Sequence, residues 1–130
     1  MKKNKYTSIE KIIQLTKKGK MFILVDDEKR ENEGDLVIST SYSNPKNINF
    51  MAKNGRGLIC MALDTAQAKK LNLTLMSSVN ISRNPKTAFT VSIESKKGVT
   101  TGISAKDRAH TIKVASKKNV NKNDIISPGH

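Results

Sequence analysis

The sequence predicts an α+β domain in which a mixed β-sheet is flanked by helices. The chain has 130 residues, a length that suits a single domain, so one domain is predicted over 1–130. Short apolar runs typical of strands are interleaved with segments that carry helix start and stop signals. Few long strand–helix–strand units occur, and this favours α+β layers over an alternating α/β fold.

The first elements are a helix and two neighbouring strands. Thr7–Glu10 has the pattern of a capping box and Gly19 can end a helix, so a helix is predicted over about 8–18. Two apolar runs follow, at 21–25 and 36–39. We predict that both are strands, that the first is buried, and that they lie side by side across the polar turn between them.

Two further helices and one more strand are expected in the middle of the chain. Asn44 followed by Pro45 predicts a helix start, and Gly55 predicts its end. Its inward-facing residues are predicted to be Ile48, Met51 and Ala52. The continuous apolar run 58–63 predicts a buried strand. Asp64 is the predicted cap of a short helix that reaches about Leu71.

The last part of the chain is predicted to contain a loop, a strand and a helix. Residues 72–86 are polar and are expected to form a mobile loop. The β-rich segment 87–93 predicts a strand. Gly98–Gly102 predicts a turn, and Ser104 predicts the start of a helix that continues to about Lys118.

Composition restricts the classes of function. The net charge is +13, but 20 of the 24 basic residues are lysines scattered in ones and twos. Arginine-rich base readout and interleaved aromatic residues are both missing, so nucleic-acid binding is the less favoured alternative. The single Cys60 excludes an internal disulfide and fits a reducing compartment. Apolar runs are too short to span a bilayer, so we expect a cytoplasmic protein.

An acidic turn is the main candidate site. Six of the eleven acidic residues lie within residues 26–35. Their mutual repulsion is relieved by a cation, and carboxylates without cysteine favour Mg²⁺ or Mn²⁺. Arg30 could pair with a phosphate or with one of the carboxylates. A metal ion with surplus carboxylates suits enolisation of a small phosphorylated carbonyl compound. The alternative is a solvated charged loop.

Other candidate residues are less distinctive. Thr100 and Thr101 precede a helix start, where hydroxyls and backbone N–H groups can bind an anion or simply cap the helix. Cys60 is interpreted as a small core residue and His110 as a surface or hydrogen-bonded histidine. His130 follows Pro128-Gly129, a tight turn that would project its side chain, although fraying is the default at a chain end.

These motifs together resemble the 3,4-dihydroxy-2-butanone 4-phosphate synthase family of riboflavin biosynthesis. The resemblance rests on a long acidic block and on shorter motifs in the same order along the chain: Val25–Leu36, Gly55–Cys60, Thr87–Val91, Gly98–Ala105, Asp107–Ala109 and Pro128–His130. Each short motif is weak alone. The acidic block combined with the others in register is specific.

The resemblance implies an α/β/α fold and a lyase that converts D-ribulose 5-phosphate into L-3,4-dihydroxy-2-butanone 4-phosphate and formate. It implies Mg²⁺ or Mn²⁺ as cofactor and a homodimer with sites near the subunit interface. It also implies the functional residues. The metal ligand is Glu31, the substrate-binding residues are Arg30, Glu31, Asp35 and Thr101, and the catalytic residues are His130, Glu33 and Asp26.

One departure from the family pattern concerns the residues after Pro128–His130. Family members continue into an Arg-x-Gly-His-Thr-Glu-Ala motif that supplies a second metal ligand and most phosphate contacts. The 130 residues do not contain that motif. We therefore expect a truncated domain with some exposed apolar strand surface, and a non-catalytic remnant that binds metal or sugar phosphate weakly is the alternative function.

Overall fold

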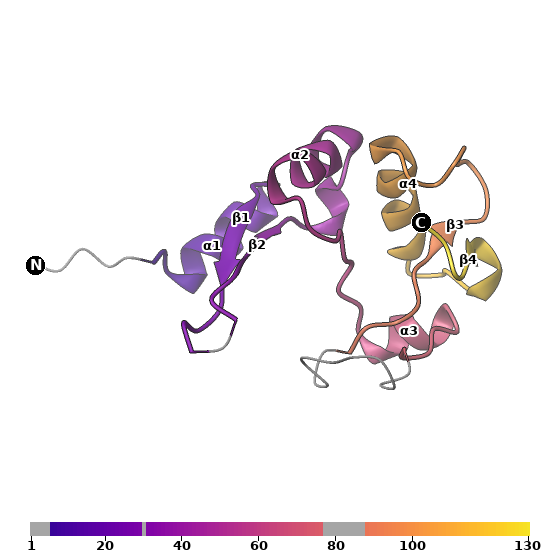
Figure 1. The fold of residues 1–130 in the computed structure, drawn as a ribbon, viewed down its shortest axis with the longest axis horizontal. Coiled ribbons are helices and arrows are strands. Elements are labelled where there is room, and N and C mark those ends of the chain that lie inside the picture. Colours follow the sequence, from indigo (N-terminus) through magenta and orange to yellow (C-terminus); the bar gives the residue numbers. More distant parts are fainter. Residues whose placement is uncertain (1–5, 30, 77–87) are drawn as a thin grey trace, which may run out of the picture.

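The computed structural model describes residues 6–29, 31–76 and 88–130. The helices are α1 (Ile9–Lys17), η1 (Thr40–Tyr42), α2 (Pro45–Gly55), α3 (Thr65–Lys70), α4 (Ala105–Ala115) and η3 (Lys122–Asp124), where η marks a 3₁₀ helix. The strands are β1 (Phe22–Val25), β2 (Gly34–Val37), β3 (Glu94–Ser95) and β4 (Ile125–Ile126). Figure 1 shows α1 and the β1–β2 hairpin on one side of α2, with α4, β3 and β4 on the other side.

The helix starts follow from local side-chain capping. Asn44 caps α2 by accepting the Asn47 N–H at 2.9 Å, and Ser104 caps α4 by accepting the Asp107 N–H at 3.0 Å. Both starts agree with the sequence prediction, as does Asp64 at α3. At α1 the cap is Ser8, one residue later than the first residue of the predicted capping box. These side chains satisfy backbone donors that the helix cannot pair internally.

Strands form two short antiparallel ladders. The β1–β2 ladder pairs Phe22 with Val37 and Val25 with Gly34. The β3–β4 ladder pairs Glu94 with Ile126 and Ser95 with Ile125. The predicted α+β class is therefore confirmed, but the described residues contain two separate two-stranded sheets where one mixed sheet was expected. The adjacency of the first two strands is also confirmed.

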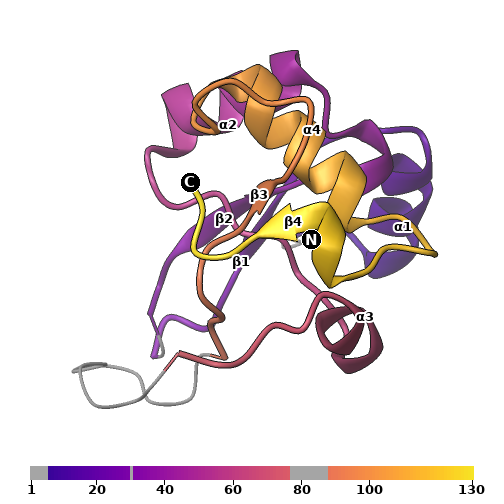
Figure 2. The same ribbon diagram turned by 90° about the vertical axis from the view of Figure 1, so that its right-hand side faces the viewer.

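The core lies around α4. A cluster of buried apolar side chains joins the residue after α3, the end of α4, the loop that follows α4, and β4: Leu71, Val114, Ala115, Val120 and Ile125. On the other face of α4, α2 packs with Ile48 as its buried residue; Figure 2 shows these two helices side by side. Within the described ranges, none of the helices combines the length and the apolar character needed to cross a membrane.

Three predictions about apolar segments are wrong. In β1, Ile23 and Leu24 are 65% and 57% exposed, because the strand pairs with β2 alone among the described residues. The run 58–63 forms no strand, and Leu58 is 86% exposed. In α2, Ala52 is exposed, although Ile48 and Met51 do face inward. An apolar run indicates burial only where a second element covers it.

The predicted strand at 87–93 is displaced toward the C-terminus. Among its described residues only Thr90 forms an isolated bridge, with Leu75, and the ladder begins at Glu94. Most of the loop predicted at 72–86 lies outside the described residues, as does Arg30. The helix predicted to end near 118 ends at Ala115, where α3 contacts it through the Gln67 amide, which donates to the carbonyls of Ala115 and Lys117.

Candidate active site

The acidic turn between β1 and β2 is closed by Asp26. Its two carboxylate oxygens accept the backbone N–H groups of Glu31 and Glu33, each at 2.9 Å. The Asp26 N–H also donates to the Glu33 carbonyl at 3.3 Å and extends the β1–β2 ladder by one bond. Asp27 accepts the Lys29 N–H at 2.8 Å. These hydrogen bonds hold the backbone of Glu31 and Glu33 beside Asp26.

The side chains around this turn remain open to solvent. Glu31, Glu33 and Asp35 are exposed. An open hollow of about 510 Å³ lies against the strand end and the first part of the turn, lined by Tyr6, Val25, Asp26, Asp27, Glu28 and Lys29. Within the described ranges, no three His, Cys, Asp or Glu side chains converge to hold a metal ion. The turn thus offers carboxylate oxygens to a cation without enclosing it.

Cys60 lies near this hairpin rather than in the core. As a whole the residue is exposed, in contrast to the predicted buried strand position. Partial burial raises the pKa of Cys60, and the negative charge of Asp35 raises it further. The thiol form is therefore favoured, which argues against a nucleophilic thiolate.

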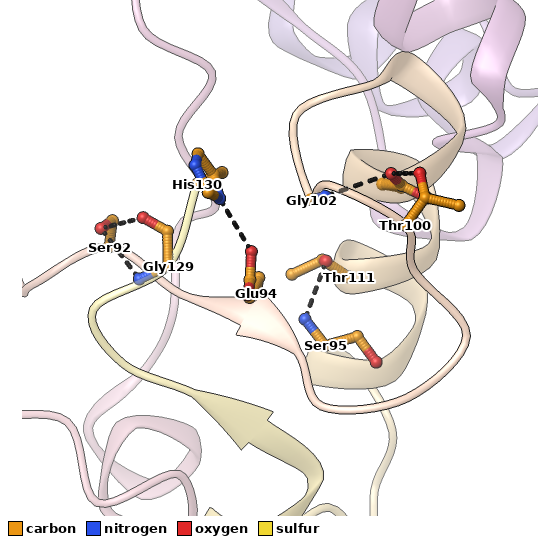
Figure 3. A network of polar contacts seen from close by, with 9 residues as sticks. Ser92, Glu94, Ser95, Thr100, Gly102, Thr111, Gly129 and His130 are labelled. Atoms are coloured by element: carbon orange, nitrogen blue, oxygen red, sulfur yellow. Dashed lines mark hydrogen bonds and ion pairs between the residues drawn. The ribbon is translucent and has the colours of Figure 1, made fainter.

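A second cluster forms where the chain returns to β3. The imidazole Nδ1 of His130 lies 3.0 Å from the Glu94 carboxylate. Figure 3 shows His130, from the segment after β4, and Glu94, from β3, pointing toward each other beside the Gly102 backbone. Glu94 is 18% exposed at its side chain and His130 is 57% exposed. His130 is hydrogen-bonded here, so the default of a frayed end does not apply.

The turn before α4 is held by a buried carboxylate. Asp107 is 2% exposed and accepts hydrogen bonds from the Thr100 hydroxyl at 2.8 Å and from the Gly102 N–H at 3.2 Å. The Thr100 hydrogen bond is the main cause of a lowered Asp107 pKa, with further bonds from the Thr100 and Gly102 backbone and from Ser104. Thr101, between the bonded residues, is exposed. The carboxylate thus fills the anion position that the sequence suggested for a ligand.

The two clusters are separate within one chain. Figures 1 and 2 show the tip of the β1–β2 hairpin turned away from the C-terminal residue. The structure therefore brings Glu31, Glu33 and Asp26 together, and separately places His130 next to the Gly102 turn that contains Thr101. The predicted residues do not form a single pocket in the described part of one chain.

The comparison with known sequences decides the family. Residues 10–130 match the family model for 3,4-dihydroxy-2-butanone 4-phosphate synthase.

The chain belongs to the 3,4-dihydroxy-2-butanone 4-phosphate synthase family.

Individual relatives agree. A 3,4-dihydroxy-2-butanone 4-phosphate synthase from Pseudomonas aeruginosa is 50% identical over 123 residues, which is 95% of this chain and 33% of the relative. The riboflavin biosynthesis protein RibBA of Aquifex aeolicus is 48% identical over 129 residues, which is 97% of this chain and 31% of the relative. The chain spans about a third of the length of these curated relatives.

Solved structures of the synthase family share the fold. RibBX, a two-domain 3,4-dihydroxy-2-butanone 4-phosphate synthase from A. baumannii, is 43% identical with a TM-score of 0.88, covering 95% of this chain and 36% of that one. A synthase crystallised in complex with two magnesium ions is 33% identical with a TM-score of 0.89, covering 96% of this chain and 58% of that one. The fold expected from the family resemblance is thereby confirmed.

Sequence reasoning missed Glu94. It directly follows the strand predicted at 87–93 and has no role in the sequence prediction, although it is the only acidic residue between Asp64 and Asp107. Its partner His130 is 36 positions away. A lone carboxylate in a basic stretch is a usable signal, but only the fold identifies its partner.

Proposed function

We propose that the protein converts D-ribulose 5-phosphate into L-3,4-dihydroxy-2-butanone 4-phosphate and formate in riboflavin biosynthesis. The observation that carries this proposal is the family match over residues 10–130, which includes the acidic turn, the Gly102 turn and His130. No single short motif would support this proposal. The occurrence of all the motifs in the same order over nearly the whole chain does support it.

The acidic turn is proposed as the metal-binding part of the site. Glu31 is the proposed ligand, and its carboxylate is the donor type that Mg²⁺ prefers. No three ligating side chains converge within the described residues, which suits an ion that keeps several waters and takes one or two carboxylates. A bound Mg²⁺ or Mn²⁺ would polarise the substrate carbonyl. A relative's complex with two magnesium ions supports this choice.

The remaining carboxylates of the turn are proposed to handle protons and substrate hydroxyls. Glu33 is exposed beside Asp26 and is a candidate base for the proton next to the carbonyl. Asp35 and Arg30 are proposed substrate contacts. Asp26 uses both oxygens on loop amides, so its contribution in this proposal is to shape the turn as well as to add negative charge.

His130 is proposed to transfer a proton during the rearrangement. Its ring is exposed on one side and hydrogen-bonded to Glu94 on the other, which suits a group that must meet a substrate. Thr101, exposed in the neighbouring turn, is the proposed substrate contact there. Because the acidic turn and His130 lie apart within one chain, we propose a homodimer with its sites near the subunit interface.

The test is formate release from ribulose 5-phosphate by the protein expressed from its own gene, with Mg²⁺ present. We expect release that stops when the metal is chelated and that falls at least a hundredfold in Glu31→Ala and His130→Ala. Glu10→Ala and His110→Gln are matched controls outside the proposed site and should retain activity. Absence of formate, with divalent-ion binding retained, would favour the non-catalytic metal or sugar-phosphate binder instead. We also propose that the protein carries out this reaction in the cytoplasm.

A further inference from the structure

The segment that carries His130 is fixed to Ser92, two residues before β3, through both the N–H and the carbonyl of Gly129. The Gly129 N–H donates to the Ser92 carbonyl at 3.1 Å, and the Ser92 hydroxyl donates to the Gly129 carbonyl at 2.6 Å. The Ser127 hydroxyl donates to the same Ser92 carbonyl at 3.0 Å. These bonds hold the residue next to His130 against Ser92, which lies two residues before Glu94 in the chain.

Glu94 is itself held by the fold. It pairs with Ile126 in the β3–β4 ladder, and the next residue, Ser95, is tied to α4 because its N–H donates to the Thr111 hydroxyl at 3.0 Å. Ser95 and Thr111 are both buried. The Glu94 side chain is only 18% exposed. The backbone of Glu94 is therefore fixed, and its carboxylate is largely shielded from solvent.

Gly102 leaves the space that the pair needs. A Cβ built at this position would collide with the Glu94 carboxylate and would lie 3.1 Å from the His130 Nδ1 atom. The φ angle of +85° is also one that glycine adopts readily and other residues do not. The Asp107 carboxylate keeps the turn at this distance by accepting the Gly102 N–H. Figure 3 shows Gly102 facing the pair from the α4 side.

We propose that Glu94 is a positioning residue for His130. A carboxylate only accepts hydrogen bonds, so the His130 Nδ1 atom must be the donor in the 3.0 Å contact. In the neutral ring this places the proton on Nδ1 and leaves the Nε2 lone pair free. Glu94 thus fixes both the orientation of the ring and the nitrogen that is available to accept a proton from a substrate.

The other histidine of the chain provides an internal reference. The His110 Nε2 atom lies 3.0 Å from the Lys97 carbonyl oxygen, which is also an acceptor only. His110 must therefore carry its proton on Nε2 when neutral. The structure thus predicts opposite tautomers for the two histidines of this protein.

Nitrogen-15 NMR of the imidazole rings tests the pairing without any activity. At about pH 9, where imidazoles are neutral, we expect the Nδ1–H tautomer at His130 and the Nε2–H tautomer at His110, assigned with His110→Gln. In Glu94→Ala the His130 ring should change to mainly Nε2–H while His110 stays unchanged, and Glu10→Ala should alter neither. An Nε2–H tautomer at His130 in the unsubstituted protein would overturn the proposal, whether or not the variant folds.

The catalytic consequence rests on the proposed function and is measured separately. In formate release from ribulose 5-phosphate, Glu94→Ala should lower kcat by roughly 10- to 100-fold, the range known for losing the carboxylate partner of a metal-ligating histidine, with KM changed less than about twofold. The double variant with His130→Ala should be no slower than His130→Ala alone. An active protein whose Glu94→Ala variant keeps full kcat would refute the positioning role. If the unsubstituted protein released no formate, the proposed function would fail, and the tautomers would still decide the pairing.

Discussion

Replacing Gly102 by alanine should destabilise the protein measurably. The φ angle of +85° costs a residue with a Cβ about 1 to 2 kcal/mol, and forcing the new methyl against the Glu94 carboxylate costs about 1 to 3 kcal/mol. The lower entropy of an unfolded chain with alanine also stabilises the folded state by about 0.4 to 1 kcal/mol. The net loss is about 1 to 5 kcal/mol in the free energy of unfolding.

Urea denaturation followed by circular dichroism measures this loss. With a urea m value of about 1.5 kcal/mol/M, the midpoint should fall by roughly 1 to 3 M. Gly57→Ala is the matched control, because Gly57 lacks a positive φ and a Cβ there would meet nothing within 4 Å. That variant should be as stable as the parent or slightly more stable. A Gly102→Ala midpoint equal to that of Gly57→Ala would refute the close approach of Gly102 to the Glu94–His130 pair.

Three further predictions concern the turn before α4 and the acidic turn. Asp107→Asn should weaken the acid dependence of stability. The folded-state pKa of Asp107 lies below the unfolded value of about 3.9. The stability that Asp107 contributes is therefore complete above that pH and is lost as the pH falls through the folded pKa. Acid titrations of the parent protein and of Asp107→Asn by fluorescence or circular dichroism should converge at low pH, and parallel curves would contradict this. Ser104→Ala removes the α4 cap and should cost about 1 kcal/mol in urea denaturation, whereas Ser116→Ala at the other end of the helix should cost less. Glu31→Ala should abolish Mn²⁺ binding in a calorimetric titration, and an unchanged affinity would remove Glu31 from the metal site.

The local features of the fold could be predicted from the sequence. Asn44, Asp64 and Ser104 each accept a backbone N–H three residues ahead, and such caps depend only on neighbouring residues. The pairing of β1 with β2 likewise follows from two apolar runs joined by a polar turn.

Features that depend on distant partners could not be predicted. The run 58–63 has the composition of a buried strand, yet Leu58 is 86% exposed, because no described element pairs with it. The strand predicted at 87–93 is misplaced for the same reason. The observed ladder starts at Glu94, because Glu94 has Ile126 as its partner. Periodicity reports which face of a segment is apolar, and it does not report what covers that face.

In the candidate site, too, contacts between sequence neighbours could be predicted and contacts between distant residues could not. The carboxylates of the acidic turn are neighbours in sequence, and Asp26 gathers them by binding the backbone N–H groups of Glu31 and Glu33. His130 was identified by its motif, but its hydrogen bond to Glu94 joins residues 36 positions apart. The placement of His130 away from the acidic turn is likewise a property of the folded chain alone.

Formate release from ribulose 5-phosphate tests the central claim most directly. The protein expressed from its own gene should produce formate in the presence of Mg²⁺. Formate release should stop when the metal is chelated, and its rate should fall at least a hundredfold in both Glu31→Ala and His130→Ala. Equal rates in the protein and in these two variants, or no formate above the protein-free control, would contradict the assignment of this reaction to the acidic turn and His130.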